Sequence, residues 1–528
     1  MEVISEIETL ISYPGGAALV ECTGDMTWYL RERGSVTSRE RRAVLPRRGR
    51  EDKGFEFNAV PRGVSEPRRR LVVIGLDSIS PDLLYRRFAS ATPRLQRLLS
   101  QSASGTLRTC DPPITVPAWA VMFSGVDPGS LGLYGFRHRR PGSYDRMYIP
   151  DSSTPLRPMV WQTLSRIGRR VAIMGMPPGF PPPALNGIAI GDFLTPDGSN
   201  DWVTPPGLRP ELEKVSGGPF FDVTFRVDDR AKVGREIFEM TRRRWRVARH
   251  LWQKEPWDLF VVHDIGPDRI HHAFWKYFDA NHPKHPLGSD LEPVASEFYR
   301  LLDEEVGSFL DALGPGVDVL VVSDHGSQPM DGCFCVNEWL IQNGYLTLKT
   351  PAPANGIPIE KAEIDWSRTQ VWGAGGYYAR LFVNEHGREP QGIVLPADRA
   401  ALIDRLRADL ALVRTPAGAP LGVRLFSPRE VYQEVRGDPP DLMAYFGETR
   451  WRSAGSVGHG RLFLDENDTG PDDAVHSFDG VIAYFDPRNP KRSDLGVQQI
   501  RDVAPTVYRL LGVPAPDWVQ GRPIHGIG

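Results

Sequence analysis

The stretch VDVLVVSDHG, residues 317–326, begins as an almost unbroken apolar run and ends in Ser-Asp-His-Gly. A continuous apolar run of this length is typical of a strand that is buried on both faces, as in a parallel sheet covered by helices. Ligands bind such sheets at the carboxyl ends of the strands. The stretch therefore predicts a central strand that presents Asp324 and His325 at its end.

Four further stretches share this apolar pattern: LVVIGLDS (71–78), VAIMGMP (171–177), LFVVHDIGPD (259–268) and DGVIAYFDP (479–487). Between them lie segments with helical periodicity, including PDLLYRRFASATPRLQRLLS (81–100) and VASEFYRLLDEEVGSFLDAL (294–313). Strands that alternate with helices predict an α/β fold. We expect three layers, α/β/α, with a mostly parallel central sheet.

Acidic residues end three of the five apolar runs. Asp77 ends the first run, Asp264 and Asp268 end the third, and Asp324 ends the fourth beside His325. Carboxylates and imidazoles without a set of cysteines suit divalent ions such as Zn²⁺, Mn²⁺ or Mg²⁺. Because strand ends gather at one edge of the sheet, these residues predict a metal site there.

The segment GPDRIHHAFWKYFD (266–279) follows the third run and is predicted to be a helix. On a helix, residues three and four positions after Asp268 lie on the same face as Asp268. Spacing alone therefore admits both His271 and His272 as ligands.

Thr115 lies in DPPITVPAWAVMFSG (111–125), where Pro117 suits the first turn of a helix. A hydroxyl at a helix N-terminus faces unpaired backbone N–H groups, which favour a bound anion such as phosphate. An aliphatic hydroxyl needs a base or a metal to act as a nucleophile. Thr115 beside a metal site would meet that requirement.

Composition excludes several classes of protein. The 528 residues are 41% hydrophobic and 24% charged, with a formal net charge of −3, which gives no reason to expect nucleic acid or an anionic membrane as partner. No run reaches the roughly 18 apolar residues of a membrane span, and the acidic N-terminus does not resemble a signal peptide. Four cysteines make no disulfide framework, so we expect a cytoplasmic, reduced protein. The oligomeric state stays open.

Residues 1–70 differ from the rest of the chain. Residues 31–70 contain twelve arginines and few apolar residues, which is typical of a linker, and VISEIETLI (3–11) is expected to form an amphipathic turn or helix. We therefore expect an N-terminal extension over 1–70 and a catalytic domain over 71–528. Within that domain, residues 197–240 and about 345–470 are rich in Pro, Gly and charge, and are expected to be insertions or a cap.

Five elements, in this order, resemble the alkaline phosphatase superfamily, and within it the type I phosphodiesterase/nucleotide pyrophosphatase branch with its bacterial predicted phosphohydrolases and phosphomutases. They are GLDS (75–78), PPITVPAW (112–119), GPDRIHH (266–272), VVSDHG (321–326) and HSFDGVIAYF (476–485). The tail DVAPTVYRLLGVPAPDWVQGRPI (502–524) also resembles the closing helix and loop of the superfamily. The resemblance covers about residues 71–528.

This resemblance implies a fold, a metal site and a reaction. The fold is alkaline phosphatase-like, and the site holds two divalent ions, Zn²⁺ first and Mn²⁺ as the alternative. The implied ligands form two sets, Asp268, His272 and His476 for one ion and Asp77, Asp324 and His325 for the other. Thr115 is the implied nucleophile of a hydrolase that forms a phosphothreonine intermediate. The implied substrate is a small-molecule phosphoester, with phosphodiesters favoured.

The family pattern Pro-Asp-x-x-x-His selects His272 over His271, which we then expect at the rim of the site or beside its ligands. Two neighbours are further candidates: Asp264 as an acceptor that orients a ligand histidine, and His263 as a substrate contact. His459, in the expected cap, is another candidate for contact with substrate.

The chain also departs from the branch pattern. Nucleotide pyrophosphatases of this branch place an Asn about twenty residues after the nucleophile, where this chain has Phe136 and Arg137. A nucleotide preference therefore stays open, and Arg137 becomes a candidate substrate contact. The alternatives are a phosphomonoesterase, a phosphonate hydrolase, a phosphotransferase or phosphomutase, and a catalytically silent binding protein. The complete set of candidate ligands argues against the last.

Overall fold

The computed structural model describes residues 9–13, 16–22, 28–31, 69–354 and 356–528. The chain divides into two units, residues 1–66 and 67–528. All of the predicted site residues belong to the second unit.

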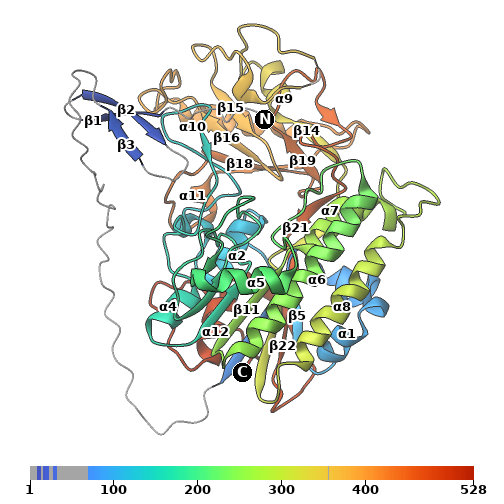
Figure 1. Cartoon of the computed structure of the whole chain (residues 1–528). Helices are drawn as coiled ribbons and strands as arrows, with labels where there is room; N and C mark the ends of the chain where they lie inside the picture. The colour runs from blue at the N-terminus through green and yellow to red at the C-terminus, as the bar shows by residue number, and fades with distance from the viewer. Residues whose placement is uncertain (1–8, 14–15, 23–27, 32–68, 355) are drawn as a thin grey trace, which may run out of the picture. The chain divides into compact units, whose positions relative to one another are not determined.

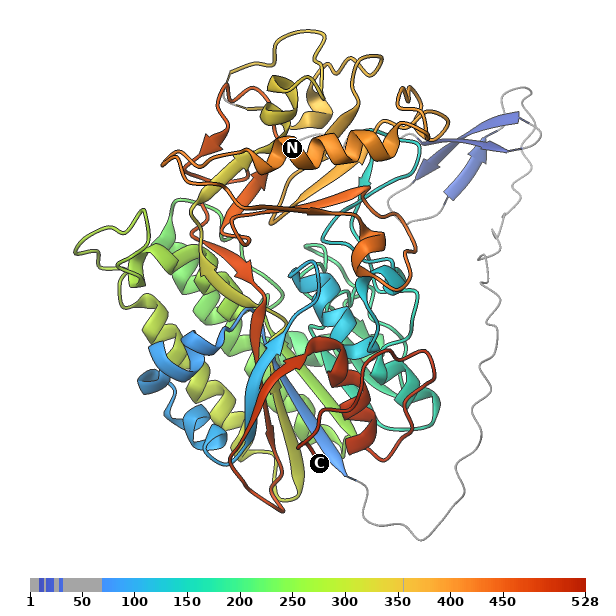
Figure 2. The ribbon, with the colours of Figure 1, turned by 180° about the vertical axis from the view of Figure 1, so that it is seen from behind.

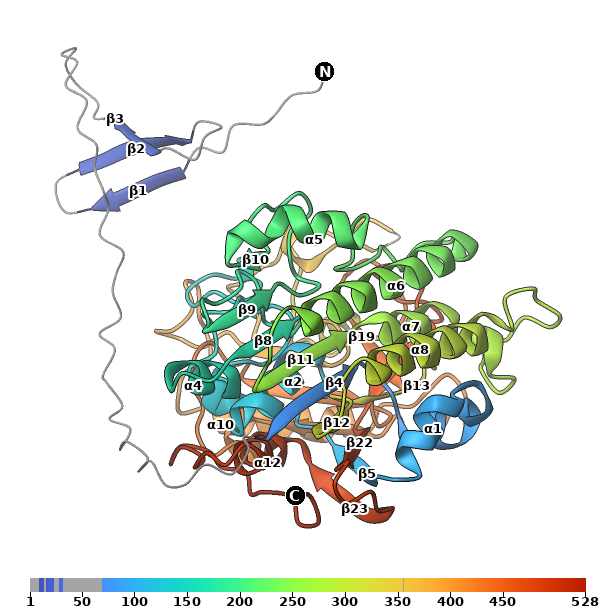
Figure 3. The same cartoon turned by 60° about the horizontal axis from the view of Figure 1, so that its bottom comes forward.

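The second unit is built around a nine-stranded sheet with the order β10-β9-β8-β11-β4-β12-β22-β5-β23 (Figure 3). The neighbouring strands from β9 to β12 run parallel, whereas β22 runs antiparallel to both of its neighbours. All five apolar runs form strands of this sheet, so the predicted mostly parallel α/β sheet is confirmed. The strands are β4 (Arg70–Leu76), β5 (Ala103–Arg108), β8 (Val171–Met174), β9 (Gly187–Ile190), β10 (Val203–Thr204), β11 (Leu259–Asp264), β12 (Val317–Val322), β22 (Asp479–Phe485) and β23 (Ser493–Gln499).

Helices cover both faces of this sheet (Figures 1 and 3). Alternate residues of one strand enter different cores, since Val72 and Ile74 pack in one core and Leu71 and Val73 in the other. The first core is closed by α1 (Pro93–Leu99), α5 (Arg209–Ser216), α6 (Arg230–Lys254), α7 (Gly266–Phe278) and α8 (Val294–Asp311). The second is closed by α2 (Thr115–Ser124), α3 (Pro128–Leu131), α4 (Val160–Arg166) and α12 (Val503–Leu510).

The predicted helix over residues 81–100 is broken into three pieces. A π-type turn at Leu83–Arg87 and a 3₁₀ turn at Ala89–Ala91 precede α1. Pro93 begins α1, and a proline disfavours the helical conformation in the residue before it, here Thr92. The helical periodicity of residues 81–100 therefore corresponds to helical turns, but the regular α-helix begins only at Pro93.

A second, mixed sheet forms a cap, which lies above the nine-stranded sheet in the view of Figure 1 and is seen from behind in Figure 2. Its strands are β14 (Gly332–Cys335), β15 (Val371–Ala374), β16 (Ala379–Val383), β17 (Val423–Phe426), β18 (Leu442–Phe446), β19 (Trp451–Ala454) and β20 (Phe463–Leu464). The cap also contains α9 (Val336–Gln342), α10 (Arg399–Ala411) and α11 (Pro428–Val431), and it has a hydrophobic core of its own. It begins at β14, earlier than the interval 345–470 expected from composition.

Two short antiparallel pairs complete the unit. β6 (His138–Arg139) pairs with β7 (Met147–Tyr148), and β13 (Gly326–Pro329) pairs with β21 (Ala474–Ser477). The second pair sets Ser327 opposite His476, so it brings two distant parts of the sequence together next to the end of β12.

The first unit contains an antiparallel sheet of β1 (Thr9–Tyr13), β2 (Gly16–Cys22) and β3 (Trp28–Arg31). The amphipathic turn or helix expected over residues 3–11 is wrong for its described part, because Thr9–Ile11 belongs to β1. Thr, Ile and Tyr in this segment are residue types that favour strands. The arginine-rich segment lies outside the described residues, apart from Arg31, Arg69 and Arg70. No helix in the described ranges is long and apolar enough to cross a membrane.

Candidate metal centre

The six predicted ligands come from four segments that meet at the carboxyl edge of the nine-stranded sheet. Asp77 directly follows β4, and Asp324 and His325 follow β12 two residues later. Asp268 and His272 lie on α7, which begins just after β11, and His476 lies on β21. All six are buried, with no more than 2% of their surface exposed.

Asp77, Asp324 and His325 form the first group, and each offers a ligand atom within 4.8 Å of the others. Nε2 of His325 lies 3.2 Å from Oδ2 of Asp324 and 3.7 Å from Oδ1 of Asp77. The loops after β4 and β12 are tied together, since the backbone N–H of Ser78 donates to Oδ1 of Asp324 at 3.2 Å and that of Ile79 donates to Ser323. Ser78 has φ 67°, a left-handed conformation that is uncommon for a residue with a side chain and is often found at functional sites.

Asp268, His272 and His476 form the second group. Nε2 of His272 lies 3.3 Å from Oδ1 of Asp268 and 3.3 Å from Nε2 of His476. Nε2 of His476 lies 3.7 Å from the same carboxylate oxygen. His325 borders this group as well, because its ligand atom lies within 4.8 Å of those of Asp268 and His476, and its ring stacks on His476 at 3.8 Å. We call the two groups together the ligand cluster.

Each carboxylate in the cluster has one oxygen held by the protein and one buried oxygen without a hydrogen-bond partner. Trp119 Nε1 donates to Oδ2 of Asp77 at 2.9 Å, and Arg269 donates to Oδ2 of Asp268 at 2.6 Å. The other oxygens, Asp77 Oδ1, Asp268 Oδ1 and Asp324 Oδ2, are buried and unpaired. Buried polar atoms are rarely left unpaired, so three such oxygens in one place point to a bound cation.

The imidazoles follow a matching pattern. Nδ1 of His325 donates to the carbonyl of Gly326 at 3.0 Å, and Nδ1 of His476 donates to that of Pro113 at 2.7 Å. Nδ1 of His272 contacts a carboxylate, Oδ1 of Asp472, at 2.7 Å. Because these partners are acceptors, Nδ1 carries the proton and Nε2 keeps a lone pair that faces the cluster. Metal-ligating histidines are commonly oriented in this way.

His271 has a different environment from its neighbour. It is fully buried, so of the two positions expected for it, the rim of the site and a place beside the ligands, burial rules out the rim. Nδ1 lies 3.0 Å from the hydroxyl of Ser327, and Nε2 lies 2.9 Å from that of Tyr299. Burial lowers the pKa of His271 to about 3. Both nitrogens of His271 therefore face residues outside the predicted ligand set, whereas Nε2 of His272 faces two members of that set, Asp268 and His476.

The charges of the cluster are poorly balanced by the protein alone. Burial and the nearby charge of Asp77 raise the pKa of Asp324 well above its usual range. Burial lowers the pKa values of His325 and His476. A buried carboxylate whose ionisation is disfavoured, beside two imidazoles that burial keeps neutral, is suited to a divalent cation. The donor set of three imidazoles and three carboxylates fits such ions.

Thr115 begins α2, and its hydroxyl lies 3.2 Å from Nε2 of His325. Since Nδ1 of His325 donates to a carbonyl, Nε2 accepts the hydroxyl proton of Thr115. The side chain is buried, with 2% of its surface exposed, and it lies at the N-terminus of a fully buried helix. Thr115 is thus placed in the first group, with its oxygen directed at the cluster.

The other predicted site residues have varied roles. His263 lies with Nε2 2.7 Å from Oδ2 of Asp77, so it supports that carboxylate rather than facing a substrate. Asp264 accepts from Trp245 and from the N–H of Gly266, so it fixes the start of α7 and does not orient a ligand histidine. Arg137 is exposed, and the ring of Phe136 lies 6.4 Å from that of Tyr377.

Sequence reasoning missed two residues that contact the cluster, Asp472 and Tyr377. Asp472 is buried and binds His272 together with Arg226 and Arg452, both at 3.0 Å. The hydroxyl of Tyr377 lies 3.0 Å from Nε2 of His272. Asp472 had a weak signal, since DDAVHS (472–477) places an acid four residues before His476. Tyr377 had none, because it comes from a cap hairpin remote in sequence from every other site residue.

Comparisons with known proteins agree with this arrangement. The family model of type I phosphodiesterase / nucleotide pyrophosphatase matches residues 71–477. The chain belongs to this family. No curated protein matches the chain in sequence.

Solved structures are similar in fold to this family member. Phosphonoacetate hydrolase from Sinorhizobium meliloti 1021, in complex with phosphonoformate, has a TM-score of 0.52 and 15% identity, over 85% of this chain and 96% of that one. Human ectonucleotide pyrophosphatase/phosphodiesterase 5 has a TM-score of 0.49 and 12% identity. The murine protein of the same name, an inactive variant in complex with AMP, has a TM-score of 0.48 and 12% identity. Both cover the same shares, 85% of this chain and 96% of their own.

Membership of the type I phosphodiesterase family makes the chain a hydrolase that acts on phosphoric ester bonds, with a small-molecule phosphoester as substrate. The family is typically metal-dependent, and the structure holds candidate groups of metal-binding residues. The resemblance deduced from the sequence is therefore confirmed at the level of family, fold and class of reaction.

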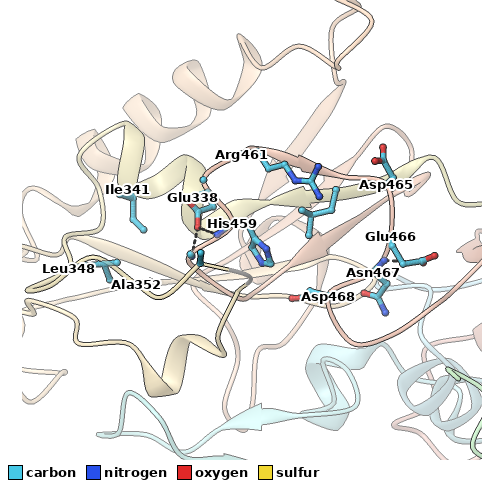
Figure 4. Close-up of a pocket in the computed structure, with 14 residues that line it drawn as sticks. Glu338, Ile341, Leu348, Ala352, His459, Arg461, Asp465, Glu466, Asn467 and Asp468 are labelled. Carbon is cyan, nitrogen blue, oxygen red and sulfur yellow. Dashed lines mark hydrogen bonds between the residues drawn. The ribbon is translucent and has the colours of Figure 1, made fainter. Parts of the chain in front are cut away.

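Two cavities of this hydrolase lie away from the cluster. The larger, about 960 Å³, lies in the cap between α9 and residues 458–468, with Glu338, His459 and Asp468 among its lining (Figure 4). The other, about 560 Å³, lies where residues 140–146 meet the cap. None of the six predicted ligands lines either cavity. His459, predicted as a substrate contact, lines the larger one, with Nε2 2.7 Å from the hydroxyl of Ser456.

Proposed function

We propose that this protein is a two-metal phosphodiesterase in which Thr115 is the nucleophile. The observation that carries the proposal is the convergence of three unpaired buried carboxylate oxygens and three imidazole Nε2 atoms beside the Thr115 hydroxyl. Such a set is costly to bury without cations, and it has little use other than to hold them.

The donor types support two divalent ions, one in each group, with Zn²⁺ favoured over Mn²⁺ because half of the donors are imidazoles. Bound there, the ions would supply Lewis acidity to a phosphoryl oxygen, activate the nucleophile and stabilise charge on the attacking and leaving oxygens. The ligands would be Asp77, Asp324 and His325 in the first group, and Asp268, His272 and His476 in the second.

The residues of the chain support a reaction in two displacements. Oγ1 of Thr115 forms a bond to phosphorus while the bond to the ester oxygen breaks, which releases an alcohol and leaves a phosphothreonine. Water then attacks phosphorus, releases the Thr115 hydroxyl and gives a phosphomonoester. The N-terminus of α2 favours the phosphoryl anion beside Thr115 through its backbone N–H groups.

The arginines that contact this region support a diester rather than a monoester. Arg269 pairs with Asp222 and Asp268, and Arg226 and Arg452 pair with Asp472. A monoester carries a second negative charge, which in a dry site needs a cationic partner of its own. Each of these three guanidiniums is already engaged by a carboxylate, with Arg226 and Arg452 sharing Asp472, so a singly charged diester suits the site better.

The state of the cysteines bears on the cellular compartment in which the protein acts. Cys110, Cys333 and Cys335, the cysteines of the unit 67–528, are all free thiols. Free thiols, two of them buried and that of Cys110 half-buried, suit a reducing environment, and we therefore propose the cytoplasm as the site of action.

The test combines metal analysis with two model substrates. Purified protein should contain close to two equivalents of zinc, and it should hydrolyse bis-p-nitrophenyl phosphate at least 100-fold faster than p-nitrophenyl phosphate in kcat/KM. Acid quenching during turnover, followed by peptide mass spectrometry, should place a phosphoryl group on Thr115. Absence of stoichiometric divalent metal, or a preference for the monoester, would contradict the proposal.

A further inference from the structure

The hairpin between β15 and β16 carries Tyr377 from the cap to the ligand cluster. Gly376 fixes this hairpin, because its N–H and carbonyl pair with the backbone of Ser453 at 2.8 and 2.9 Å. Gly375 has no room for a side chain, since a Cβ there would lie 2.3 Å from the backbone nitrogen of Gly455. The position of Tyr377 is therefore set by the backbone of the cap sheet.

The ring of Tyr377 is held on both faces. It stacks on the ring of His476 with a centroid distance of 3.8 Å and an angle of 25°. The guanidinium of Arg452 lies 4.1 Å from the same centroid. Two groups this close to one centroid must lie on opposite faces, so the ring is clamped between an imidazole and a cation. This clamp leaves the hydroxyl as the end of the side chain that faces the cluster.

The hydroxyl has two neighbours, and they define the direction of its proton. Nη2 of Arg226 donates to the oxygen of Tyr377 at 3.1 Å, so the phenolic proton points elsewhere. The described acceptor for it is Nε2 of His272 at 3.0 Å. If a cation takes the lone pair of His272, this acceptor is lost and the phenolic proton is available to an oxygen of the substrate.

Thr115 and Tyr377 lie in opposite halves of the cluster. The hydroxyl of Thr115 contacts His325 in the first group, whereas Tyr377 contacts His272 and His476 in the second. In an in-line displacement, the nucleophile and the leaving oxygen lie on opposite sides of phosphorus. With Thr115 attacking from the first group, the leaving oxygen faces the second group and the Tyr377 hydroxyl.

We propose that Tyr377 is a catalytic residue that donates a hydrogen bond to the leaving-group oxygen of the phosphodiester. The inference rests on the proposed function, and it adds a substrate class. When the ester bond breaks, the electron pair stays on the leaving oxygen, the phenolic O–H stabilises that charge, and solvent supplies the proton that completes the alcohol. Such a donor matters most when the leaving group is a poor one, so the natural substrates are diesters of aliphatic alcohols.

The test uses Tyr377→Phe in the zinc-loaded enzyme and a series of diesters that differ in the leaving group. Removing one donor to a developing oxyanion costs on the order of 100-fold in rate. We expect a loss of this size for methyl phenyl phosphate and a loss below about 3-fold for methyl p-nitrophenyl phosphate. The dependence of log kcat/KM on leaving-group pKa should therefore steepen. Vanadate, which offers an oxygen on the leaving-group side, should bind the variant about 10-fold more weakly.

Tyr378→Phe is the matched control, because its hydroxyl donates to the carbonyl of Tyr134 and not to the cluster. It should leave the leaving-group dependence unchanged. The inference would be overturned if Tyr377→Phe lowered kcat/KM equally for all diesters or did not lower it at all. It would also be overturned if the variant lost zinc, because the hydroxyl would then serve to hold His272 in place. Failure of the wild-type enzyme to bind zinc or cleave diesters would instead contradict the proposed function, so the two failures are distinguishable.

Discussion

The two halves of the ligand cluster are built in different ways. The first half, with Thr115, takes its ligands from the ends of the neighbouring strands β4 and β12, and its supporting contacts join these two loops directly. The second half takes its ligands from α7 and β21, and its supports are Asp472, Tyr377 and Arg452. Two of these supports, Tyr377 and Arg452, belong to the cap.

This difference separates the tasks of the two halves. The half with Thr115, the proposed nucleophile, adjoins the strands β4 and β12, which are buried on both faces. The half proposed to face the leaving group has contacts with the cap residues Tyr377 and Arg452, so we expect changes in the cap to alter which alcohols leave without disturbing Thr115. Functional sites on a common fold vary in this way, with chemistry on the scaffold and specificity in the inserted parts.

The largest expected effect comes from Thr115, the proposed nucleophile. Thr115→Ala removes the oxygen that bonds to phosphorus, so we expect kcat for bis-p-nitrophenyl phosphate to fall on the order of 10⁴-fold or more. Zinc content should stay at the wild-type value, because Thr115 contributes no carboxylate or imidazole to either group. Steady-state kinetics and metal analysis measure the two quantities on the same sample. Thr163→Ala, in a buried position of α4, should keep full activity. Normal turnover by Thr115→Ala would show that the first half of the cluster does not hold the nucleophile.

The second prediction concerns the adjacent histidines of α7. His272→Ala removes a ligand of the second half, so we expect about one equivalent of zinc to be lost and activity to fall by about 10³-fold. His271→Ala should keep both equivalents. It should lower stability by about 2–4 kcal/mol, because it opens a cavity and leaves the hydroxyls of Tyr299 and Ser327 without their partner. Metal analysis and denaturant unfolding measure these effects. Equal loss of zinc in the two variants would mean that the helix face has been misassigned.

The third prediction concerns a support of the second half. Asp472→Asn keeps the shape of the side chain but weakens the contact that orients Nδ1 of His272. Partners of ligand histidines typically contribute 10–100-fold to metal affinity, so one zinc should bind about 10–100-fold more weakly while the other is unaffected. Competition with a chromophoric chelator resolves the two sites. Asp473→Asn is the control, because Asp473 is equally buried but pairs with Lys276 at 3.2 Å instead of a histidine. Weakening of both sites by Asp472→Asn would show that the halves are not independent.

The sequence predicted the first half better than the second, and the reason is physical. Asp77, Asp324 and His325 directly follow apolar runs, and a buried strand followed by an acid is visible in a single segment. The helix of Asp268 and His272 was also predictable from spacing, as far as the choice between His271 and His272. Only the family pattern made that choice, and the structure adds a physical reason, since Tyr299 and Ser327 occupy both nitrogens of His271.

The supports could not be predicted, because they depend on contacts between distant segments. Tyr377 meets His272 across 105 residues, and Asp472 meets it across 200 residues. Neither contact has a local pattern. The same limit explains why the cap was placed too late in the chain: β14 pairs with β19 and β20, and such pairing between distant strands is not visible in composition.

The smallest predicted effect concerns His138, which lies outside both halves of the ligand cluster. It should make the stability of the protein sensitive to acid independently of the cluster, so its contribution must be known before the two halves are compared at low pH. Burial, and then the charge of Arg380, lower the pKa of His138 to about 3. The backbone N–H of Tyr134 donates to Nε2 of His138 at 3.0 Å, which requires that nitrogen to be unprotonated. His138 therefore favours folding fully at a pH above its unfolded pKa of about 6.5, and this contribution is lost as the pH falls from there towards 3.

Protonation of His138 should make the free energy of unfolding about 2 kcal/mol smaller at pH 5 than at pH 8. In His138→Gln the side-chain oxygen can still accept from Tyr134, but it does not titrate. The loss of stability between pH 8 and pH 5 should therefore be smaller by about 2 kcal/mol in this variant, as measured by denaturant unfolding of the metal-free protein at both values. Zinc stoichiometry at pH 8 should match the wild type, because His138 contacts no residue of the cluster. If the loss of stability between pH 8 and pH 5 is unchanged in His138→Gln, the acid sensitivity comes from the ligand cluster instead. The same measurement on Asp472→Asn would then show how much of it comes from the second half.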